Sequence, residues 1–150
     1  YYSIEMLRGG AKESVAVELK KSAIKQGIFI KQSFEWHDNK KYTLNYIHAN
    51  MLDVIDMDLG CFDFVMALCS IYYLDDDSIL RLANHICKIT DIFVLQCNIA
   101  EEKKLSGYQY QKASISYAQH ILNASGFSSI NTISPAGYSR PLVIGKKYDY

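Results

Sequence analysis

The fold of this chain is decided by residues 62–70, which read FDFVMALCS. One acidic residue, Asp63, stands near the start of a run that is otherwise apolar as far as Cys69. A short, continuous apolar run of this kind predicts a strand that is covered on both faces, as the strands of parallel sheets are. We therefore expect Phe62–Cys69 to form a strand inside an α/β sheet.

Strands and helices alternate on both sides of this run. The other predicted strands are Ser14–Leu19, Tyr42–His48, Ile89–Asn98, Ser128–Ile133 and Leu142–Lys146. The predicted helices are Tyr2–Arg8, Lys20–Trp36 with Ile24, Ile28 and Lys31 on one face, the stretch from Asp75–Asp77 to Cys87, and Ala113–Ser125.

This alternation is typical of βαβ units. It predicts a doubly wound, Rossmann-like, mostly parallel sheet in a three-layer α/β/α domain that spans residues 1–150. The last two strands have no helix between them, which predicts a C-terminal antiparallel hairpin at one edge. The acidic run Asp75–Asp77 is interpreted as a helix N-cap in preference to a metal site.

Composition narrows the class of protein. Hydrophobic residues make up 49% of the 150 residues and charged residues 21%, as in an ordinary globular domain. The formal net charge is zero, so there is no strong sign of DNA binding, although a neutral sum can hide a local basic patch. No apolar run is long enough to cross a bilayer, and we expect a cytoplasmic protein.

The cysteines indicate the redox environment. Cys61, Cys69, Cys87 and Cys97 form no C-x-x-C pair, and three of them lie in apolar runs. They are interpreted as buried free thiols in a reducing compartment. No metal site is expected.

The residues that follow each strand are the candidates for a site, because ligands of such sheets bind beyond the carboxyl ends of the strands. Glu18 ends an apolar strand, where a carboxylate can accept both hydroxyls of a ribose; the alternative is a surface acid paired with Lys20 or Lys21. Asn50 and Met51 follow the strand Tyr42–His48. An amide beside a flexible apolar side chain can read an adenine edge and cover its face, and the alternative is a plain loop asparagine.

The order of these pieces resembles a class I S-adenosylmethionine-dependent methyltransferase. Tyr1–Leu19 resembles the helix and second strand that follow the glycine loop of that family. Phe62–Tyr73 resembles its fourth strand and the segment beyond. The endings Ala124–Phe127 and Arg140–Gly145 resemble the A-G-F close of its last helix and its terminal antiparallel strand.

The resemblance implies a cofactor, S-adenosylmethionine, and a set of residues that hold it. The implied cofactor-binding residues are Tyr1, Tyr2, Glu18, Leu19, Asn50, Met51, Ala67 and Leu68, with Glu18 on the ribose and Asn50 and Met51 on the adenine. Tyr72 and Tyr73 are the candidates for a catalytic or substrate-facing role, and the alternative is packing against the next helix. Residues 100–112, with Tyr108 and Tyr110, are a candidate substrate lid or an exposed connector.

The chain departs from the family at its start. The first strand and its D-x-G-x-x-x-G loop belong immediately before Tyr1, so we expect this chain to be a truncated or partly recorded form of a longer protein, which alone can be inactive. Without its central strand, such a sheet would expose two rows of unpaired backbone groups.

The substrate is narrowed by two motifs that the sequence lacks. The end of the strand at Cys69 has no N/D-P-P-Y/F pattern of enzymes that methylate DNA base amino groups, and there is no P-C dipeptide for cytosine carbon methylation. A small molecule or a modified nucleoside, such as a wobble uridine of tRNA, is the expected acceptor; no oligomeric state is predicted. Two alternatives stay open: a nicotinamide-dependent oxidoreductase and a non-catalytic methyltransferase-like scaffold.

Overall fold

The computed structural model describes residues 1–97, 112–134 and 140–148. The chain divides into two compact units, residues 1–58 and 59–150. The predicted lid, residues 100–112, lies outside the described residues except for Lys112.

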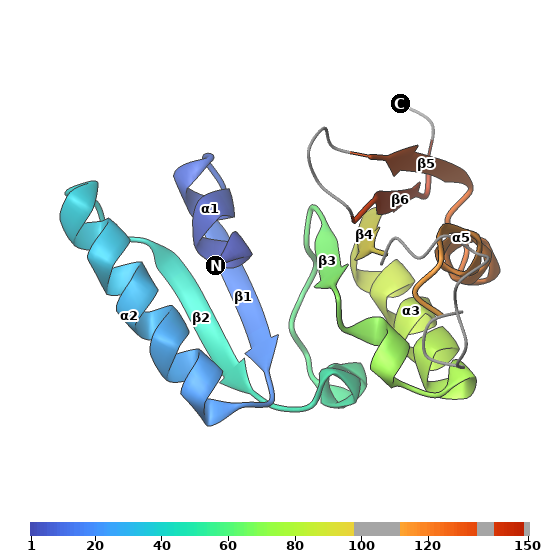
Figure 1. Ribbon diagram of the computed structural model, residues 1–150, viewed down its shortest axis with the longest axis horizontal. Helices are drawn as coiled ribbons and strands as arrows, with labels where there is room; N and C mark the ends of the chain where they lie inside the picture. Colours follow the sequence, from blue (N-terminus) through green and yellow to red (C-terminus); the bar gives the residue numbers. More distant parts are fainter. Residues whose placement is uncertain (98–111, 135–139, 149–150) are drawn as a thin grey trace. The chain divides into compact units, whose positions relative to one another are not determined.

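The first unit is a two-stranded parallel sheet with its helices (Figure 1). Its elements are α1 (Tyr2–Arg8), β1 (Glu13–Glu18), α2 (Lys21–His37), β2 (Thr43–His48) and the 3-10 helix η1 (Met51–Asp56). β1 and β2 pair in register from Glu13 opposite Thr43 to Glu18 opposite His48. The two strands therefore end side by side, as the sequence predicts for a βαβ unit.

A small apolar core joins both helices of this unit to one face of the sheet. Ile4 and Leu7 of α1 are buried with Tyr42 and Leu44, and Ala16, Ile30, Phe34 and Tyr46 pack around them. Gly27 lets α2 approach β2 closely, because a Cβ at this position would lie 2.6 Å from the hydroxyl oxygen of Tyr46. The predicted helix is confirmed, but the face that Ile24, Ile28 and Lys31 share is not the one that packs on this core. Ile28 is 40% exposed, and Ile30 and Phe34 face the core.

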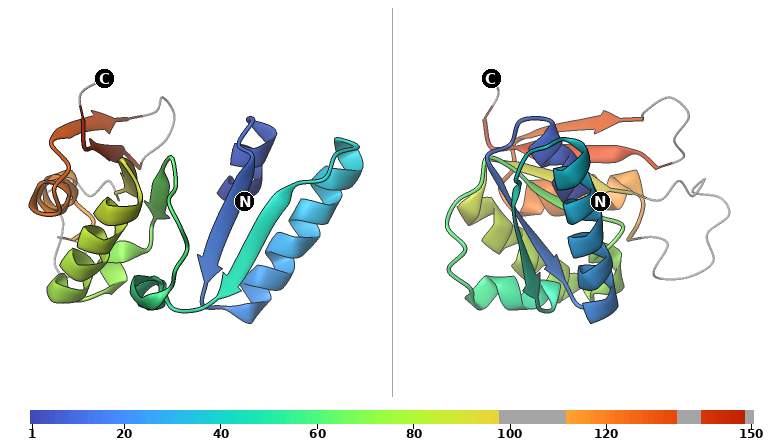
Figure 2. Two further views of the ribbon diagram at one scale, coloured as in Figure 1. Left: turned by 180° about the vertical axis from the view of Figure 1, so that it is seen from behind. Right: turned by 90° about the vertical axis from the view of Figure 1, so that its left-hand side faces the viewer.

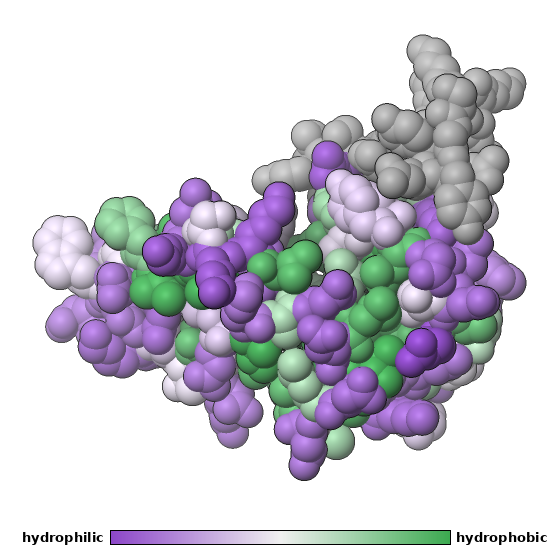
Figure 3. Space-filling view, turned by 90° about the horizontal axis from the view of Figure 1, so that it is seen from below, coloured by the Kyte–Doolittle hydropathy of each residue, from purple (hydrophilic) through white to green (hydrophobic). Residues whose placement is uncertain are grey.

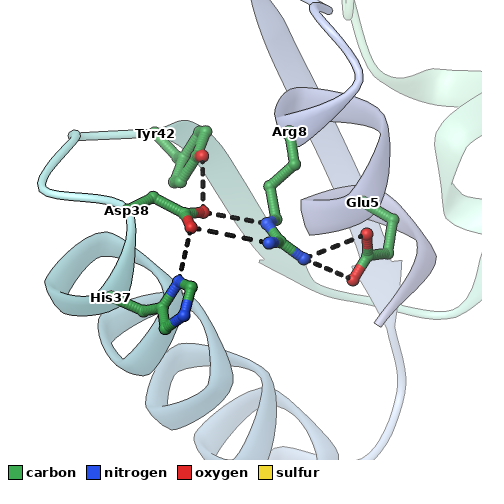
Figure 4. A network of polar contacts seen from close by, with 5 residues as sticks. All are labelled: Glu5, Arg8, His37, Asp38 and Tyr42. Carbon is green, nitrogen blue, oxygen red and sulfur yellow. Dashed lines mark hydrogen bonds and ion pairs between the residues drawn. The ribbon is translucent and has the colours of Figure 1, made fainter.

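A polar network connects the same elements at the opposite end of the strands from Glu18 (Figure 4). Asp38 accepts hydrogen bonds from Arg8 Nε at 2.8 Å, Tyr42 Oη at 2.8 Å and His37 Nδ1 at 2.8 Å. These donors, His37 first, hold the pKa of the Asp38 carboxyl well below its usual range. Arg8 also lies over the Phe34 ring, 4.2 Å from its centroid, and so ties α1 to the end of α2.

The second unit is a mixed sheet covered by two long helices (Figure 2). Its elements are β3 (Val65–Leu68), the 3-10 helix η2 (Ile71–Tyr73), α3 (Asp76–Ile89), β4 (Ile92–Gln96), α5 (Ile115–Ala124), β5 (Ser129–Ile133) and β6 (Leu142–Lys146). The strand order is β3-β4-β6-β5, with β3 and β4 parallel and β6 antiparallel to both of its neighbours. The predicted C-terminal hairpin at one edge is confirmed.

The core of this unit lies where α3 and α5 meet the sheet. The fully buried side chains at its centre are Ile79, Phe93, Leu122, Phe127 and Val143. Asp75 caps α3 as predicted: its two carboxylate oxygens accept hydrogen bonds from the Ser78 backbone nitrogen at 2.8 Å and the Ser78 hydroxyl at 2.7 Å.

Two expectations for this unit are wrong. The strand predicted for Phe62–Cys69 is shorter, because Phe62 makes only an isolated bridge with Thr90 and Phe64 is 37% exposed. All four cysteines are free, but Cys61 is exposed, Cys69 and Cys87 are half-buried, and Cys97 alone is buried.

No helix in the described ranges has the length and apolar character that a membrane span needs.

Candidate functional site

The carboxyl ends of the strands carry most of the predicted site residues. In the first unit β1 ends at Glu18 and β2 at His48; in the second, β3 ends at Leu68 and β4 at Gln96. Figure 3 looks from the side toward which β1 and β2 of the first unit run, and on this unit apolar side chains lie among hydrophilic ones. Ligands of α/β sheets bind at such an edge.

Glu18 is partly exposed at the junction of β1 and α2. Its Oε1 accepts a hydrogen bond from the backbone nitrogen of Lys20, the N-cap residue of α2, at 2.8 Å. Among the described residues the second carboxylate oxygen accepts no hydrogen bond, and Glu18 forms no ion pair with Lys20 or Lys21. The carboxylate is thus held in place by one oxygen and can receive donors on the other.

Leu19 and His48 lie at the ends of β1 and β2, beside Glu18. The Leu19 side chain is 60% exposed. Its carbonyl oxygen accepts a hydrogen bond from His48 Nε2 at 3.0 Å, which links the ends of β1 and β2. The parallel register of β1 and β2 places His48 opposite Glu18.

Asn50 has a structural task in the loop after β2. Its Oδ1 accepts a hydrogen bond from the Leu52 backbone nitrogen at 3.0 Å, and its own backbone nitrogen donates to Asp53 Oδ2 at 2.8 Å. This reciprocal cap starts η1, whose first residue is the half-buried Met51. The amide oxygen of Asn50 is thereby occupied, and its NH₂ group keeps two donors for a ligand.

Tyr1 and Tyr2 stand at the start of α1, which runs antiparallel to β1 (Figure 1). Their side chains are 67% and 48% exposed, and their rings meet edge to face with centroids 5.8 Å apart. The N-terminus of α1 points toward the edge at which β1 ends. The two rings are accessible, and their contact with a cofactor stays a prediction.

The end of β3 turns sharply in the second unit. Ala67 and Leu68 are half-buried strand residues that pair with Leu95 and Gln96 of β4. The next residue, Cys69, has a φ of +51°, a backbone conformation that is uncommon for residues other than glycine. Such backbone is concentrated at functional sites, and here it directs the chain into η2.

A polar cluster surrounds the Cys69 thiol. Cys69 Sγ donates a hydrogen bond to Gln96 Oε1 at 3.0 Å and accepts one from Arg140 Nη1 at 2.6 Å. Gln96 is the last residue of β4, and Arg140 precedes β6 by two residues. Neither Gln96 nor Arg140 was identified as a site residue from the sequence. Gln96 could have been found, because it is a polar residue near the end of an otherwise apolar strand.

Tyr72 and Tyr73 follow on η2 with their ring centroids 4.8 Å apart. Tyr73 is 66% exposed, whereas Tyr72 is half-buried. Burial, with the Cys69 thiol and the Tyr73 phenol close by, raises the pKa of Tyr72 to about 12. Tyr72 therefore stays protonated at neutral pH, as a hydrogen-bond donor and not a base.

Two of the three acidic side chains at the start of α3 are engaged by other groups of the protein. Asp75 is the N-cap of α3. Asp76 forms an ion pair with Lys112 Nζ at 3.2 Å and accepts a hydrogen bond from the Tyr117 hydroxyl. In the part of the chain that the structure describes, no group of three or more His, Cys, Asp or Glu side chains is placed to hold a metal ion.

No protein-family model matches the chain, and no curated protein matches its sequence. Solved structures do share its fold. Magnesium protoporphyrin IX methyltransferase (ChlM) from Synechocystis PCC 6803 with bound SAM superposes with a TM-score of 0.68 at 13% identity, over 97% of this chain and 64% of that one. PigF with SAH gives a TM-score of 0.67 at 15% identity, over 96% of this chain and 46% of that one.

A third structure, an O-methyltransferase family protein from Burkholderia thailandensis, gives a TM-score of 0.59 at 11% identity, over 97% of this chain and 56% of that one. The chain thus spans less than two thirds of the length of each of these proteins. The strand order, the C-terminal antiparallel hairpin and these superpositions agree. The chain has the α/β Rossmann-like fold of class I S-adenosylmethionine-dependent methyltransferases.

Proposed function

We propose that this chain is the catalytic domain, or part of it, of an S-adenosylmethionine-dependent methyltransferase that acts on a small molecule or a modified nucleoside. The observation that carries the proposal is Glu18, a carboxylate at the end of β1 with one oxygen fixed on Lys20 and the other open to donors. In nucleotide-binding sheets an acid after the second strand accepts ribose hydroxyls, and this general rule supports the same role for Glu18. The solved structures of this fold with bound SAM or SAH support the same cofactor.

The residues of the first unit suit the nucleoside half of that cofactor. Glu18 accepts the ribose hydroxyls, and the two amide donors of Asn50 suit the ring nitrogens of adenine. The exposed Leu19 and the half-buried Met51 offer apolar surface for the base. Tyr1 and Tyr2 are further candidates for contact with the cofactor.

The residues of the second unit suit the methionine half and the acceptor. Ala67 and Leu68 bring the backbone at the end of β3 to the ligand. The cofactor supplies a methyl group already activated on a sulfonium, so the protein mainly positions the acceptor and excludes water. Tyr72, protonated below its pKa of about 12, donates a hydrogen bond to the acceptor, and Tyr73 presents an accessible ring.

The interpretation that a strand and a glycine-rich loop precede Tyr1 is part of the proposal. In the described part of the first unit β1 pairs with β2 alone, and in that of the second unit β3 pairs with β4 alone. Each of the two strands has an open edge that can pair with one further strand. We also propose a cytoplasmic location, which the four free thiols support.

Calorimetric titration of the complete protein tests the cofactor. S-adenosylhomocysteine is expected to bind with a micromolar dissociation constant, while NAD is expected to give no heat at the same concentrations. Tight binding of NAD without binding of S-adenosylhomocysteine would overturn the proposal in favour of an oxidoreductase. No heat with either ligand at millimolar concentration would leave a non-catalytic scaffold.

A further inference from the structure

The outward face of α2 carries no carboxylate. Ten residues of this helix are exposed, and they are Lys21, Ser22, Lys25, Gln26, Ile28, Phe29, Gln32, Ser33, Trp36 and His37. Residues 20–41 contain six lysines and two acidic residues, a local net charge of +4 within a chain of zero net charge. The neutral sum therefore conceals a basic segment.

Both acids of this segment are turned inward and engaged. Glu35, with a side chain 9% exposed, pairs with Lys41 at 3.2 Å and Lys31 at 3.7 Å and accepts the Tyr42 backbone nitrogen at 3.0 Å. Asp38 is 18% exposed and is held by the network of Figure 4. Among the described residues, the ammonium groups of Lys21 and Lys25 have no ion-pair partner. Both positive charges are therefore available to an anionic ligand.

Two large aromatic side chains stand on the same face. Trp36 is 86% exposed and Phe29 is 70% exposed. They are seven residues apart, so they lie on one side of the helix about 10 Å apart along its axis. Together with Gln32 they line an open groove of about 700 Å³. Rings this exposed gain little from the protein's own core and are available for stacking.

We propose that this face of α2 binds single-stranded nucleic acid. Lys21 and Lys25 neutralise phosphates, bases stack on Phe29 and Trp36, and the Gln32 amide faces a base edge. Cationic side chains interleaved with exposed aromatic rings are the combination that single strands require, because phosphates need charge and unstacked bases need a π-surface. The inference uses no residue of the proposed cofactor site and stands without it.

The charge pattern favours this occupant over a protein. Lysine is depleted from the centres of protein interfaces. A second copy of the chain would bring the same acid-free face and therefore no counter-charge for Lys21 and Lys25. A polyanion supplies that charge along its whole length.

Trp36 is the only tryptophan of the chain, so its fluorescence reports on this face alone. Titration of the full chain with a 20-nucleotide oligouridylate is expected to quench this fluorescence with saturation. If two phosphates are neutralised, raising the salt from 50 to 200 mM weakens binding about sevenfold, given a slope of about −0.7 per phosphate for single strands. A duplex of the same length is expected to quench much less, since its bases are already stacked.

Variants separate charge from stacking. With a fluorescein-labelled oligouridylate followed by anisotropy, the double variant Lys21→Glu/Lys25→Glu and the variant Trp36→Ala are each expected to lose about tenfold in affinity. Trp36→Phe keeps most of it. Lys12→Glu/Lys88→Glu, which reverses two exposed lysines outside α2, is the matched charge control and is expected to bind as the parent does.

Three results would overturn the proposal. One is the absence of both quenching and anisotropy change at 100 μM protein in 50 mM salt. Another is equal loss of affinity in Lys12→Glu/Lys88→Glu and in the α2 double variant, which marks a diffuse charge effect. The third is a blue shift of Trp36 that grows with protein concentration without oligonucleotide, which assigns the face to a second copy.

Discussion

At the scale of a single residue, Glu18 has one role that the structure shows and one that we propose, and the two are separable. One carboxylate oxygen holds the backbone nitrogen of Lys20 at the start of α2, and the other is open. A glutamine at this position keeps an acceptor for Lys20 and loses the negative charge that strengthens hydrogen bonds from ribose hydroxyls. The two roles therefore respond differently to the same substitution.

We predict that Glu18→Gln lowers the affinity for S-adenosylhomocysteine about tenfold to hundredfold and changes the melting temperature little. Calorimetry and thermal unfolding measure the two effects. Glu13→Gln, at the opposite end of β1, is the control and is expected to bind normally. Unchanged affinity in Glu18→Gln would remove Glu18 from the site.

Part of the site could be predicted residue by residue and part could not. Glu18, Asn50 and Met51 lie at or just after the ends of their strands in the sequence, so the rule that ligands bind at strand ends makes them candidates. Arg140 and Cys69 are 71 residues apart, and nothing local marks their contact. The capping of η1 by Asn50 was also missed, since it depends on how the chain turns after β2.

At the scale of the element, the start of α3 is set by Asp75. Its two hydrogen bonds to Ser78 satisfy donors that the first helical turn leaves free, and they hold the pKa of the Asp75 carboxyl below its ordinary value. Asp77 lies in the same turn and is exposed, and its carboxylate makes no hydrogen bond among the described residues.

Replacing the cap is expected to lower stability. We predict that Asp75→Ala lowers the melting temperature by about 2–4 °C, because the cap is lost from a helix that packs on the core. Thermal unfolding followed by circular dichroism measures the change. Asp77→Ala is the matched control, and an equal fall in both variants would show that helix-dipole charge and not the cap matters.

The stability that the polar network of α1, α2 and β2 gives to the first unit is expected to depend on pH. The pKa of Asp38 is depressed in the folded state, so its contribution is present above the unfolded pKa, near 3.8, and is lost as the pH falls toward the folded value. Glu35, whose pKa is lowered mainly by the Tyr42 backbone hydrogen bond, acts with the same sign. The first unit is therefore destabilised by acid below about pH 5.

We predict that Asp38→Asn is less stable than the parent at pH 7 and that this difference shrinks by pH 3. Urea unfolding at a series of pH values measures it. Asp58→Asn, an exposed position of the same unit, is expected to follow the parent at every pH. A constant difference between Asp38→Asn and the parent across the range would contradict the role of this carboxylate.

At the scale of the whole molecule, the two units have unequal cores. Five of the nineteen buried apolar residues in the described chain belong to residues 1–58, and fourteen belong to the second unit. The first unit also has a sheet of two strands with an open edge on β1. Isolated two-stranded sheets are marginally stable, so local opening is expected there first.

Hydrogen exchange followed by mass spectrometry tests this inequality. We predict that amides of β1 and β2 exchange at least tenfold faster than amides of β4 and β6 in the absence of ligand. S-adenosylhomocysteine is expected to slow exchange in the first unit, where the proposed ribose and adenine residues lie. Uniform protection of both units without ligand would show that they open together.

The sequence by itself determined the order of strands and helices, the C-terminal hairpin and the cap of α3. These features depend on local periodicity and on side chains three or four residues apart, which a linear reading contains. Tertiary structure decided the inward face of α2, the true length of β3, and the cluster of Cys69, Gln96 and Arg140. It also turned Glu35 and Asp38 inward and left the outer face of α2 without a carboxylate, because burial and pairing depend on neighbours that are distant in sequence.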